Sequence, residues 1–142
     1  MGAVDWKAAG AAYLPHINAV EHELGLPADL LARLAFQECS WRPDVIYGRI
    51  TSPSGAVGMF QLMPEYFPGA GISWQLDAET AGKYLILLHR RFQDWTLALA
   101  AYNWGPNNAQ KYVEGQLSKL PAETAHYVAQ ITADTGLKGA LA

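Results

Sequence analysis

Apolar residues recur at helical spacing along most of this chain, and proline or glycine interrupts the pattern at short intervals. Residues three or four apart share one face of an α-helix, whereas a half-buried strand alternates apolar and polar residues. The helical pattern is clearest over residues 78–92, where one apolar stripe contains Ala81, Leu85, Leu88 and Phe92. No strand-like alternation of useful length is present, although residues 44–54 leave room for a small β-ribbon. The pattern therefore predicts a mostly α fold.

Segments on either side of residues 78–92 carry similar patterns and recognisable helix boundaries. The expected helices span residues 4–24 with an interruption at Pro15, residues 26–43, residues 95–103 and residues 121–135. Asp94 stands immediately before the third of these segments, where a carboxylate can accept hydrogen bonds from the first helical N–H groups. Gly136 follows the fourth segment and is expected to end it, because glycine tolerates the left-handed conformation found at many helix ends.

The chain has 142 residues, which is enough for one domain with a core of its own. Apolar residues make up 51% of the sequence and charged residues only 16%, as is typical of a folded protein rather than a disordered one. Cys39 is the sole cysteine, so no intrachain disulfide can form and packing alone must hold the fold together. We expect a single domain over residues 1–142 that acts as a monomer.

The net charge of −3 and the scatter of the basic residues argue against two classes of partner. Nucleic acids and anionic membranes both favour clustered Lys and Arg, so we expect no nucleic-acid partner. The histidines show no spacing typical of a metal site, and no metal or other cofactor is expected. No stretch approaches transmembrane length, and residues 1–10 lack the pattern of a signal peptide.

Glu38 is a carboxylate at a position where the helical pattern favours an apolar side chain. Leu31, Leu34 and Ala35 share its helix face by their spacing. A carboxyl group on that face is partly removed from water, which disfavours the charged form and is expected to raise the pKa. A carboxylic acid that stays protonated near neutral pH is what general-acid chemistry needs. The alternative is a structural helix-end residue that pairs with Arg33 or Arg42.

Separated motifs extend the pattern beyond Glu38. One segment reads Glu-Cys-Ser-Trp-Arg-Pro at residues 38–43, and the next reads Ser-Pro-Ser-Gly-Ala-Val-Gly-Met-Phe-Gln-Leu-Met-Pro at residues 52–64. Further on, Ala-Tyr-Asn-Trp-Gly-Pro stands at residues 101–106 and Glu-Thr-Ala-His-Tyr-Val at residues 123–128. In this order and spacing the segments resemble the soluble lytic transglycosylase family, whose lysozyme-like domain cleaves bacterial peptidoglycan. The resemblance covers residues 26–131.

The resemblance implies a lysozyme-like helical fold, with Glu38 as the catalytic acid. It implies a further set of substrate-binding residues: Ser52, Ser54, Met59, Gln61, Tyr102, Asn103, Glu123 and Tyr127. Ser52 and Met59 would act through the backbone, while Gln61 offers both a donor and an acceptor to sugar groups. Structural roles are the alternative, above all for Glu123 in a first helical turn and for Tyr127 on an apolar stripe.

Ordinary glycosidases use two carboxylates, but here only Glu38 is both inside a motif and buried by pattern. Asp44 and Glu65 are candidates for a second carboxylate, and nothing in the sequence marks either one. In the resembled family one acid suffices, because the N-acetyl group and the C6 hydroxyl of N-acetylmuramic acid complete the reaction. The resemblance thus implies lytic cleavage of the β-1,4 bond between N-acetylmuramic acid and N-acetylglucosamine, with a 1,6-anhydromuramoyl product.

Other functions fit the same residues. A goose-type lysozyme-like hydrolase would use the same acid with water as the attacking group, and an inactive module would bind glycan strands or serve in a larger assembly. A buried acid together with Gln61 and Tyr102 favours an enzyme, since a pure binding module needs no such acid. Peptidoglycan as the partner places the action on the bacterial cell wall, in the periplasm or outside the cell. A short chain without a leader also suits a phage-encoded or virion-associated protein.

Two features depart from the family pattern. Cys39 stands where a serine usually follows the acid, which exchanges a good hydroxyl donor for a weak thiol donor. The stretch after Pro43 is longer than usual, and residues 46–50 are expected to form either a lip over the cleft or a plain surface loop. As a lip, the stretch would bring Tyr47 or Arg49 to a peptide stem or to the lactyl group of the sugar.

Overall fold

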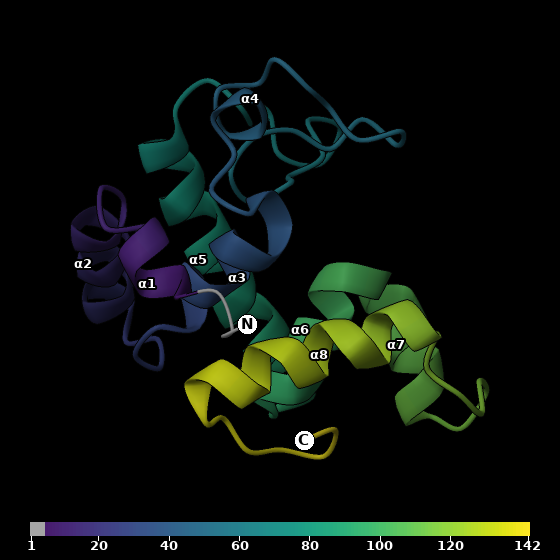
Figure 1. Ribbon diagram of the computed structural model, residues 1–142. Coiled ribbons are helices and arrows are strands. Elements are labelled where there is room, and N and C mark those ends of the chain that lie inside the picture. Colours follow the sequence, from purple (N-terminus) through teal and green to yellow (C-terminus); the bar gives the residue numbers. More distant parts are fainter. Residues whose placement is uncertain (1–4) are drawn as a thin grey trace. The chain divides into compact units, whose positions relative to one another are not determined.

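The computed structural model describes residues 5–142, which fold mainly into α-helices (Figure 1). The helices of this part of the chain are α1 (Trp6–Ala9), α2 (Leu14–Leu24), α3 (Leu30–Cys39), α4 (Pro43–Ile46), α5 (Trp74–Phe92), α6 (Trp95–Trp104), α7 (Pro106–Val113) and α8 (Ala122–Thr135). The prediction of a mostly α fold is confirmed. No helix within residues 5–142 is both long enough and apolar enough to cross a lipid bilayer.

The chain divides into two compact units, Met1–Lys83 and Tyr84–Ala142. Helix α5 supplies residues to both units. Each unit buries apolar side chains of its own, for example Phe60 in the first unit and Ile131 in the second. The expected single domain over residues 1–142 stays a prediction.

The first helical segment is interrupted earlier than the sequence indicates. The break falls at residues 10–13 instead of at Pro15, and Gly10 caps the end of α1. The Trp41 indole lies against Gly10, where a Cβ would come within 2.3 Å of it. Pro15 lies inside the first turn of α2, where a missing N–H costs nothing. A contact with Trp41, far along the chain, therefore requires glycine at the boundary between α1 and α2.

Helix α3 packs against α2 in the first unit, and a buried carboxylate joins their ends. Glu21 accepts hydrogen bonds from the backbone N–H of Asp29 at 3.1 Å and of Ala32 at 3.0 Å. The Asn18 side chain donates to the same carboxylate at 2.7 Å. Asp29 precedes α3 in the left-handed conformation and forms an ion pair with Lys7 (2.9 Å) in place of a side-chain cap. Glu21, which lies on the neighbouring helix, therefore caps α3.

The β-ribbon expected near residues 44–54 is absent from the described chain, and this expectation is wrong. Residues 43–46 form α4 instead, since Pro43 fits the first helical position and Asp44 suits the positive end of the helix dipole. Turns follow, and the one β-pairing within residues 5–142 is an isolated antiparallel bridge between Val57 and Leu62.

In the second unit, α6 packs against both α7 and α8. Asp94 caps α6 as predicted, because its Oδ1 accepts the N–H groups of Thr96 (2.8 Å) and Leu97 (3.0 Å). Burial alone would raise the pKa of Asp94, but the hydrogen bonds from Thr96, Ala140 and Leu97 outweigh burial and hold this pKa below its usual range. Gly136 ends α8 in the left-handed conformation, which confirms that prediction as well.

Candidate active site

Glu38 lies in the last turn of α3 and is half-buried. Leu31, Leu34 and Ala35, which share its helix face, are fully buried. The prediction that this face is an apolar, buried one is therefore confirmed. The carboxyl group stands at the partly exposed end of a face that is otherwise closed to water.

The backbone directly after Glu38 adopts a conformation that most residues avoid. Ser40 and Trp41 have φ angles of 52° and 55°, in the left-handed region. Trp41 is held in this bend, because its Nε1 donates to the Trp6 carbonyl oxygen at 2.9 Å and its ring stacks on Tyr13 with centroids 5.4 Å apart. Such backbone strain costs about 1–3 kcal/mol per residue and is often found at functional sites.

The Cys39 thiol is buried beside Glu38, with only 2% of the residue exposed. Burial, helped by the charge of Glu38, raises the pKa of the thiol to about 12 against the opposing hydrogen bonds from the backbone of Trp41 and Arg42. The thiol is therefore protonated at neutral pH and is not a nucleophile. The residue next to Glu38 in the chain is therefore a buried, neutral thiol.

One of the two arginines considered as a structural partner of Glu38 is paired elsewhere. Arg42 forms an ion pair with Asp44, with Nη2 2.8 Å from Oδ2, so the alternative of a pair between Glu38 and Arg42 does not hold. Arg33 donates from Nη1 to Oε1 of Gln37 at 3.0 Å. Asp44, one of the two candidates for a second carboxylate, is engaged in its pair with Arg42.

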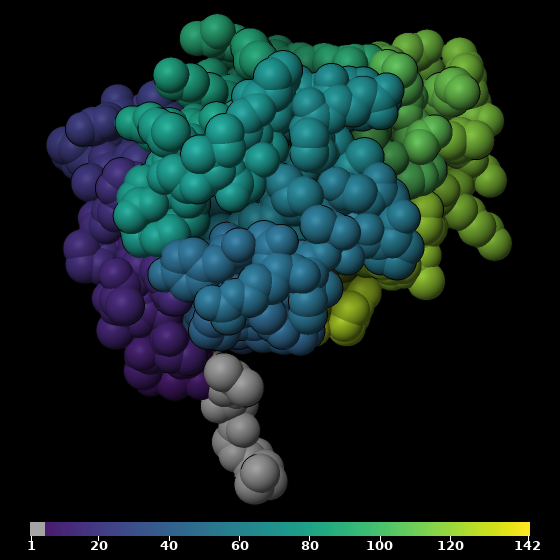
Figure 2. Space-filling model, turned by 90° about the horizontal axis from the view of Figure 1, so that it is seen from above, coloured from purple at the N-terminus to yellow at the C-terminus, as the bar shows by residue number. Residues whose placement is uncertain are grey.

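Ser52 and Ser54 lie together in one turn of the segment between α4 and α5. Their Oγ atoms are 3.1 Å apart, and the Ser52 Oγ accepts the N–H of Ala56 at 2.9 Å. Ser52 is half-buried and Ser54 is exposed. This segment, drawn in blue to teal, lies at the surface in the view of Figure 2.

Gln61 stands in the tight turn that the bridge between Val57 and Leu62 closes. Its backbone is left-handed, with φ of 49°, and its Nε2 donates to the carbonyl oxygen of Gly58 at 2.9 Å. The Gln61 Oε1 has no hydrogen-bond donor among residues 5–142. Because Gln61 is only half-buried, this oxygen can accept a hydrogen bond from a sugar hydroxyl or an amide N–H.

The buried side chain of Asp77, which the sequence analysis did not single out, supports this turn. Asp77 is 3% exposed and accepts the N–H of Gly71, with Oδ2 at 3.0 Å. Burial raises the pKa of Asp77, and the Gly71 N–H offsets only part of that rise. Gly58 has a φ of 78°, and a Cβ there would lie 2.8 Å from the Asp77 Oδ2. Only glycine fits both the dihedral and the space.

Met59 is fully buried, so its side chain cannot reach a ligand. The sequence analysis expected Met59 to bind substrate through its backbone, and this role stays a prediction. In the sequence, Asp77 immediately precedes the most regular predicted helix, residues 78–92, but the sequence alone did not indicate which loop its carboxylate supports.

The remaining predicted residues lie in the second unit, where α6 carries Tyr102 and Asn103. Tyr102 is half-buried against an apolar cluster that includes Leu88, and its ring centroid is 5.7 Å from that of Tyr84. The Asn103 Oδ1 accepts a hydrogen bond from the Oγ1 of Thr124 at 2.8 Å. This bond joins α6 to α8 and fixes the orientation of the Asn103 amide.

Helix α8 begins beside this bond. Glu123 is exposed in the first turn of α8, and Tyr127 is buried one turn later. Thr124 is buried as well, and the sequence analysis gave it no separate role although it lies inside the closing motif. Among the residues that the structure describes, no group of three or more His, Cys, Asp or Glu side chains is placed to hold a metal ion.

Comparison with known proteins places these motifs in a family. The family model described as "Transglycosylase SLT domain" matches residues 15–124. The chain is 36% identical over 104 residues to membrane-bound lytic murein transglycosylase F 2 of Alkalilimnicola ehrlichii, which covers 66% of this chain. It is 34% identical over 110 residues to membrane-bound lytic murein transglycosylase F of Pseudoalteromonas translucida, which covers 68% of this chain.

A third relative, membrane-bound lytic murein transglycosylase F of Marinobacter nauticus, is 34% identical over 95 residues, or 58% of this chain. The matched regions make up 22% of the first relative, 22% of the second and 18% of the third. The chain therefore spans only a minor part of the length of these curated relatives.

Proposed function

The chain belongs to the transglycosylase SLT domain family, and we propose that it is a peptidoglycan lytic transglycosylase. The proposed reaction cleaves the β-1,4 bond between N-acetylmuramic acid and N-acetylglucosamine and leaves a 1,6-anhydromuramoyl end. The names of the relatives support this reaction, since each is a lytic murein transglycosylase.

The observation that carries the proposal is the position of Glu38. Its carboxyl group is half-buried at the end of an apolar helix face, beside a thiol that stays protonated. It also lies in the last turn of α3, where the helix dipole places partial negative charge and disfavours another. Both surroundings favour a protonated acid that still has access to solvent and substrate.

In the proposed mechanism, Glu38 donates its proton to the glycosidic oxygen as that oxygen leaves C1 of the muramic residue. The departing N-acetylglucosamine keeps the proton in its new 4-hydroxyl, and the N-acetyl group of the muramic residue stabilises C1. The Glu38 carboxylate then accepts the C6 hydroxyl proton while O6 bonds to C1. The acid is regenerated and no water is consumed. General acid–base catalysis of this kind contributes about 10²–10⁴-fold to a rate.

We assign the substrate contacts to the residues that match the family motifs: Ser52, Ser54, Met59, Gln61, Tyr102, Asn103, Glu123 and Tyr127. The unpartnered Oε1 of Gln61 and the exposed Ser54 hydroxyl support direct contacts with sugar groups. Met59 contributes only backbone. Burial of Tyr127 and the bond from Thr124 to Asn103 support positioning roles for these two.

The proposed partner is the glycan strand of the bacterial cell wall, in the periplasm or outside the cell. The mild net charge of −3 supports a partner other than nucleic acid. We propose that the chain acts on the strands as a monomer with the single domain expected from its length.

Product analysis tests the function directly. The wild-type protein is incubated with purified sacculi, and the released muropeptides are identified by mass spectrometry. We expect anhydromuropeptides, which are lighter than the hydrolysis products by one water. Reducing muramic ends would instead identify a hydrolase of the goose-lysozyme type, and no release at all would leave only a binding module.

A further inference from the structure

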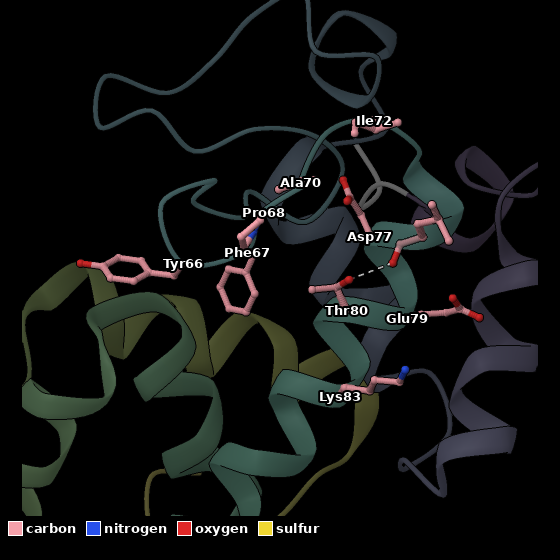
Figure 3. A pocket seen from close by; sticks show the side chains of 11 residues that line it. Tyr66, Phe67, Pro68, Ala70, Ile72, Asp77, Glu79, Thr80 and Lys83 are labelled. Atoms are coloured by element: carbon pink, nitrogen blue, oxygen red, sulfur yellow. Dashed lines mark hydrogen bonds between the residues drawn. The ribbon is translucent and has the colours of Figure 1, made fainter.

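A groove in the first unit lies outside the residues assigned to cleavage (Figure 3). Its volume is about 450 Å³, and its walls are the loop of residues 66–72 and helix α5. Leu76, Thr80 and Lys83 are spaced four and three residues apart along α5 and line the groove from one helix face. None of the residues proposed to act in cleavage lines it.

The rim of the groove is unusually apolar for a protein surface. Tyr66 is 70% exposed, Ile72 is 81% exposed and Leu76 is 58% exposed. Figure 3 shows Tyr66 and Ile72 at opposite ends of the loop, with Thr80, Glu79 and Lys83 on the neighbouring helix α5. Exposed apolar side chains gathered around one groove mark a binding surface.

Two opposite charges stand on the α5 wall without partners. Glu79 and Lys83 are exposed and lie one helical turn apart. Neither makes a hydrogen bond or an ion pair with any of residues 5–142. The Thr80 hydroxyl between them donates to the Leu76 carbonyl oxygen at 3.1 Å and keeps its lone pairs for another donor. The groove therefore offers one cation, one anion and apolar contacts to a ligand.

We propose that this groove binds the peptide stem of peptidoglycan, an inference that rests on the proposed function. The stem combines small alanine methyl groups with the carboxylate of a glutamyl residue and the ammonium and carboxylate of a diamino acid. Lys83 fits a carboxylate of the stem and Glu79 fits the ammonium, while the apolar rim covers the methyl groups. Charges of both signs on one short ligand match the two unpaired charges of the groove.

The groove adjoins the turn that we assign to the glycan. The Gly58 Cα faces Asp77, and Gly71 lies against the Val57 side chain, so that a Cβ at Gly71 would be 2.9 Å from Val57 Cγ2. Asp77 lines the groove and Val57 closes the turn of Gln61. A stem that branches from a sugar near Gln61 therefore has a neighbouring surface to follow.

Binding of a synthetic stem peptide tests the proposal. The probe is the tetrapeptide L-Ala–γ-D-Glu–meso-diaminopimelate–D-Ala, titrated into the intact chain and followed by isothermal calorimetry. We expect Glu79→Gln and Lys83→Met each to weaken binding about two- to fivefold, as for exposed ion pairs, and the double variant about tenfold. Glu23→Gln and Lys119→Met, exposed charges elsewhere in the chain, serve as matched controls and should bind as the wild type does.

Cleavage assays separate this proposal from the proposed function. Each protein is assayed on glycan strands with their stems and on strands freed of stems by an amidase. We expect the double variant to lose the preference for stem-bearing strands and to cleave stem-free strands at the wild-type rate. Failure of every protein to cleave strands of either kind would count against the proposed function, whatever the peptide titrations show.

Three results would overturn the groove assignment while cleavage persists. One is a tetrapeptide that does not bind, and another is a double variant that binds it as tightly as the wild type. The third is self-association of the wild type in sedimentation experiments that Ile72→Ser abolishes, because the apolar rim would then be a contact between copies of the chain. Circular dichroism spectra equal to the wild-type spectrum establish that the variants are folded.

Discussion

At the N-terminal end of α3 the Glu21 carboxylate is buried and accepts the N–H groups of Asp29 and Ala32, whereas at the C-terminal end Glu38 is half-exposed. Helix α3 thus has a carboxyl group at each end: Glu21 of the neighbouring α2 lies at its N-terminal end, and its own Glu38 lies at its C-terminal end. The N–H groups at the start of α3 donate to Glu21, whereas Glu38 lies in the last turn, at the negative end of the α3 dipole.

This difference separates a carboxylate with a structural role, Glu21, from the proposed catalytic acid, Glu38. Glu21 uses both oxygens on hydrogen bonds to backbone N–H groups and has no access to a substrate. Glu38 has an apolar face behind it and a partly open side in front. Burial by itself therefore does not identify a catalytic acid. The identification also needs a route to solvent, which the half-buried Glu38 has and Glu21 lacks.

Removal of the Glu21 carboxylate should give the largest stability effect. Glu21→Ala leaves the N–H groups of Asp29 and Ala32 without partners in a buried place, and we expect a loss of about 2–3 kcal/mol in the free energy of unfolding. Urea denaturation followed by circular dichroism measures it. Glu23→Ala, an exposed glutamate on the same helix, is the control and should change stability by less than about 0.5 kcal/mol. An equal effect of both variants would contradict the capping role.

Asp77 extends the comparison to a carboxylate that is buried but holds a single N–H group. Asp77→Ala leaves only the Gly71 N–H unpaired, so we expect a smaller loss of about 1–2 kcal/mol. The matched control is Glu79→Ala, two residues further along α5 and exposed. Thermal unfolding of both proteins gives the comparison, and a loss for Asp77→Ala larger than that for Glu21→Ala would reverse the order proposed here.

The charge of Asp77 should also make stability depend on pH. Its pKa in the folded protein lies above the ordinary value of 3.8, so its contribution is fully present below pH 3.8 and is lost as the pH rises through the folded pKa. Asp77→Asn keeps an acceptor for Gly71 and cannot ionise. The variant should therefore gain stability relative to the wild type between about pH 3 and about pH 7. A stability difference that does not change with pH would show that the charge costs nothing.

Cys39 gives the smallest expected effect at the Glu38 end. Cys39→Ser restores the hydroxyl that is usual after the acid, and we expect kcat/KM on sacculi equal to the wild type or up to about threefold higher, because a hydroxyl is a stronger donor than a thiol. Cys39→Ala provides the comparison without any donor. A collapse of activity in the serine variant alone would mean that the thiol itself is needed.

Regular helices could be predicted from local patterns. The segments 78–92, 95–103 and 121–135 correspond to α5, α6 and α8, because their apolar stripes and caps are written within a few turns of sequence. Helix α7 was not predicted, since Gly105 and Pro106 indicate a helix end. In the structure Pro106 opens a new helix at its first position instead.

Contacts between distant segments account for what could not be predicted. Gly10 at the break packs against Trp41, the cap of α3 comes from Glu21, and Gly58 in its turn packs against Asp77. No local pattern reports such pairs. The apolar face of Glu38 was predictable because helical spacing alone defines it.

The central claim is that Glu38, and no other carboxylate of the first unit, supplies the proton. The direct measurement is the initial rate of anhydromuropeptide release from sacculi by Glu38→Gln, with Glu65→Gln as the control for the remaining candidate carboxylate. We predict a loss of at least about 10²-fold for Glu38→Gln, with unchanged unfolding, and no loss for Glu65→Gln. Release at the wild-type rate by a folded Glu38→Gln protein would contradict the account.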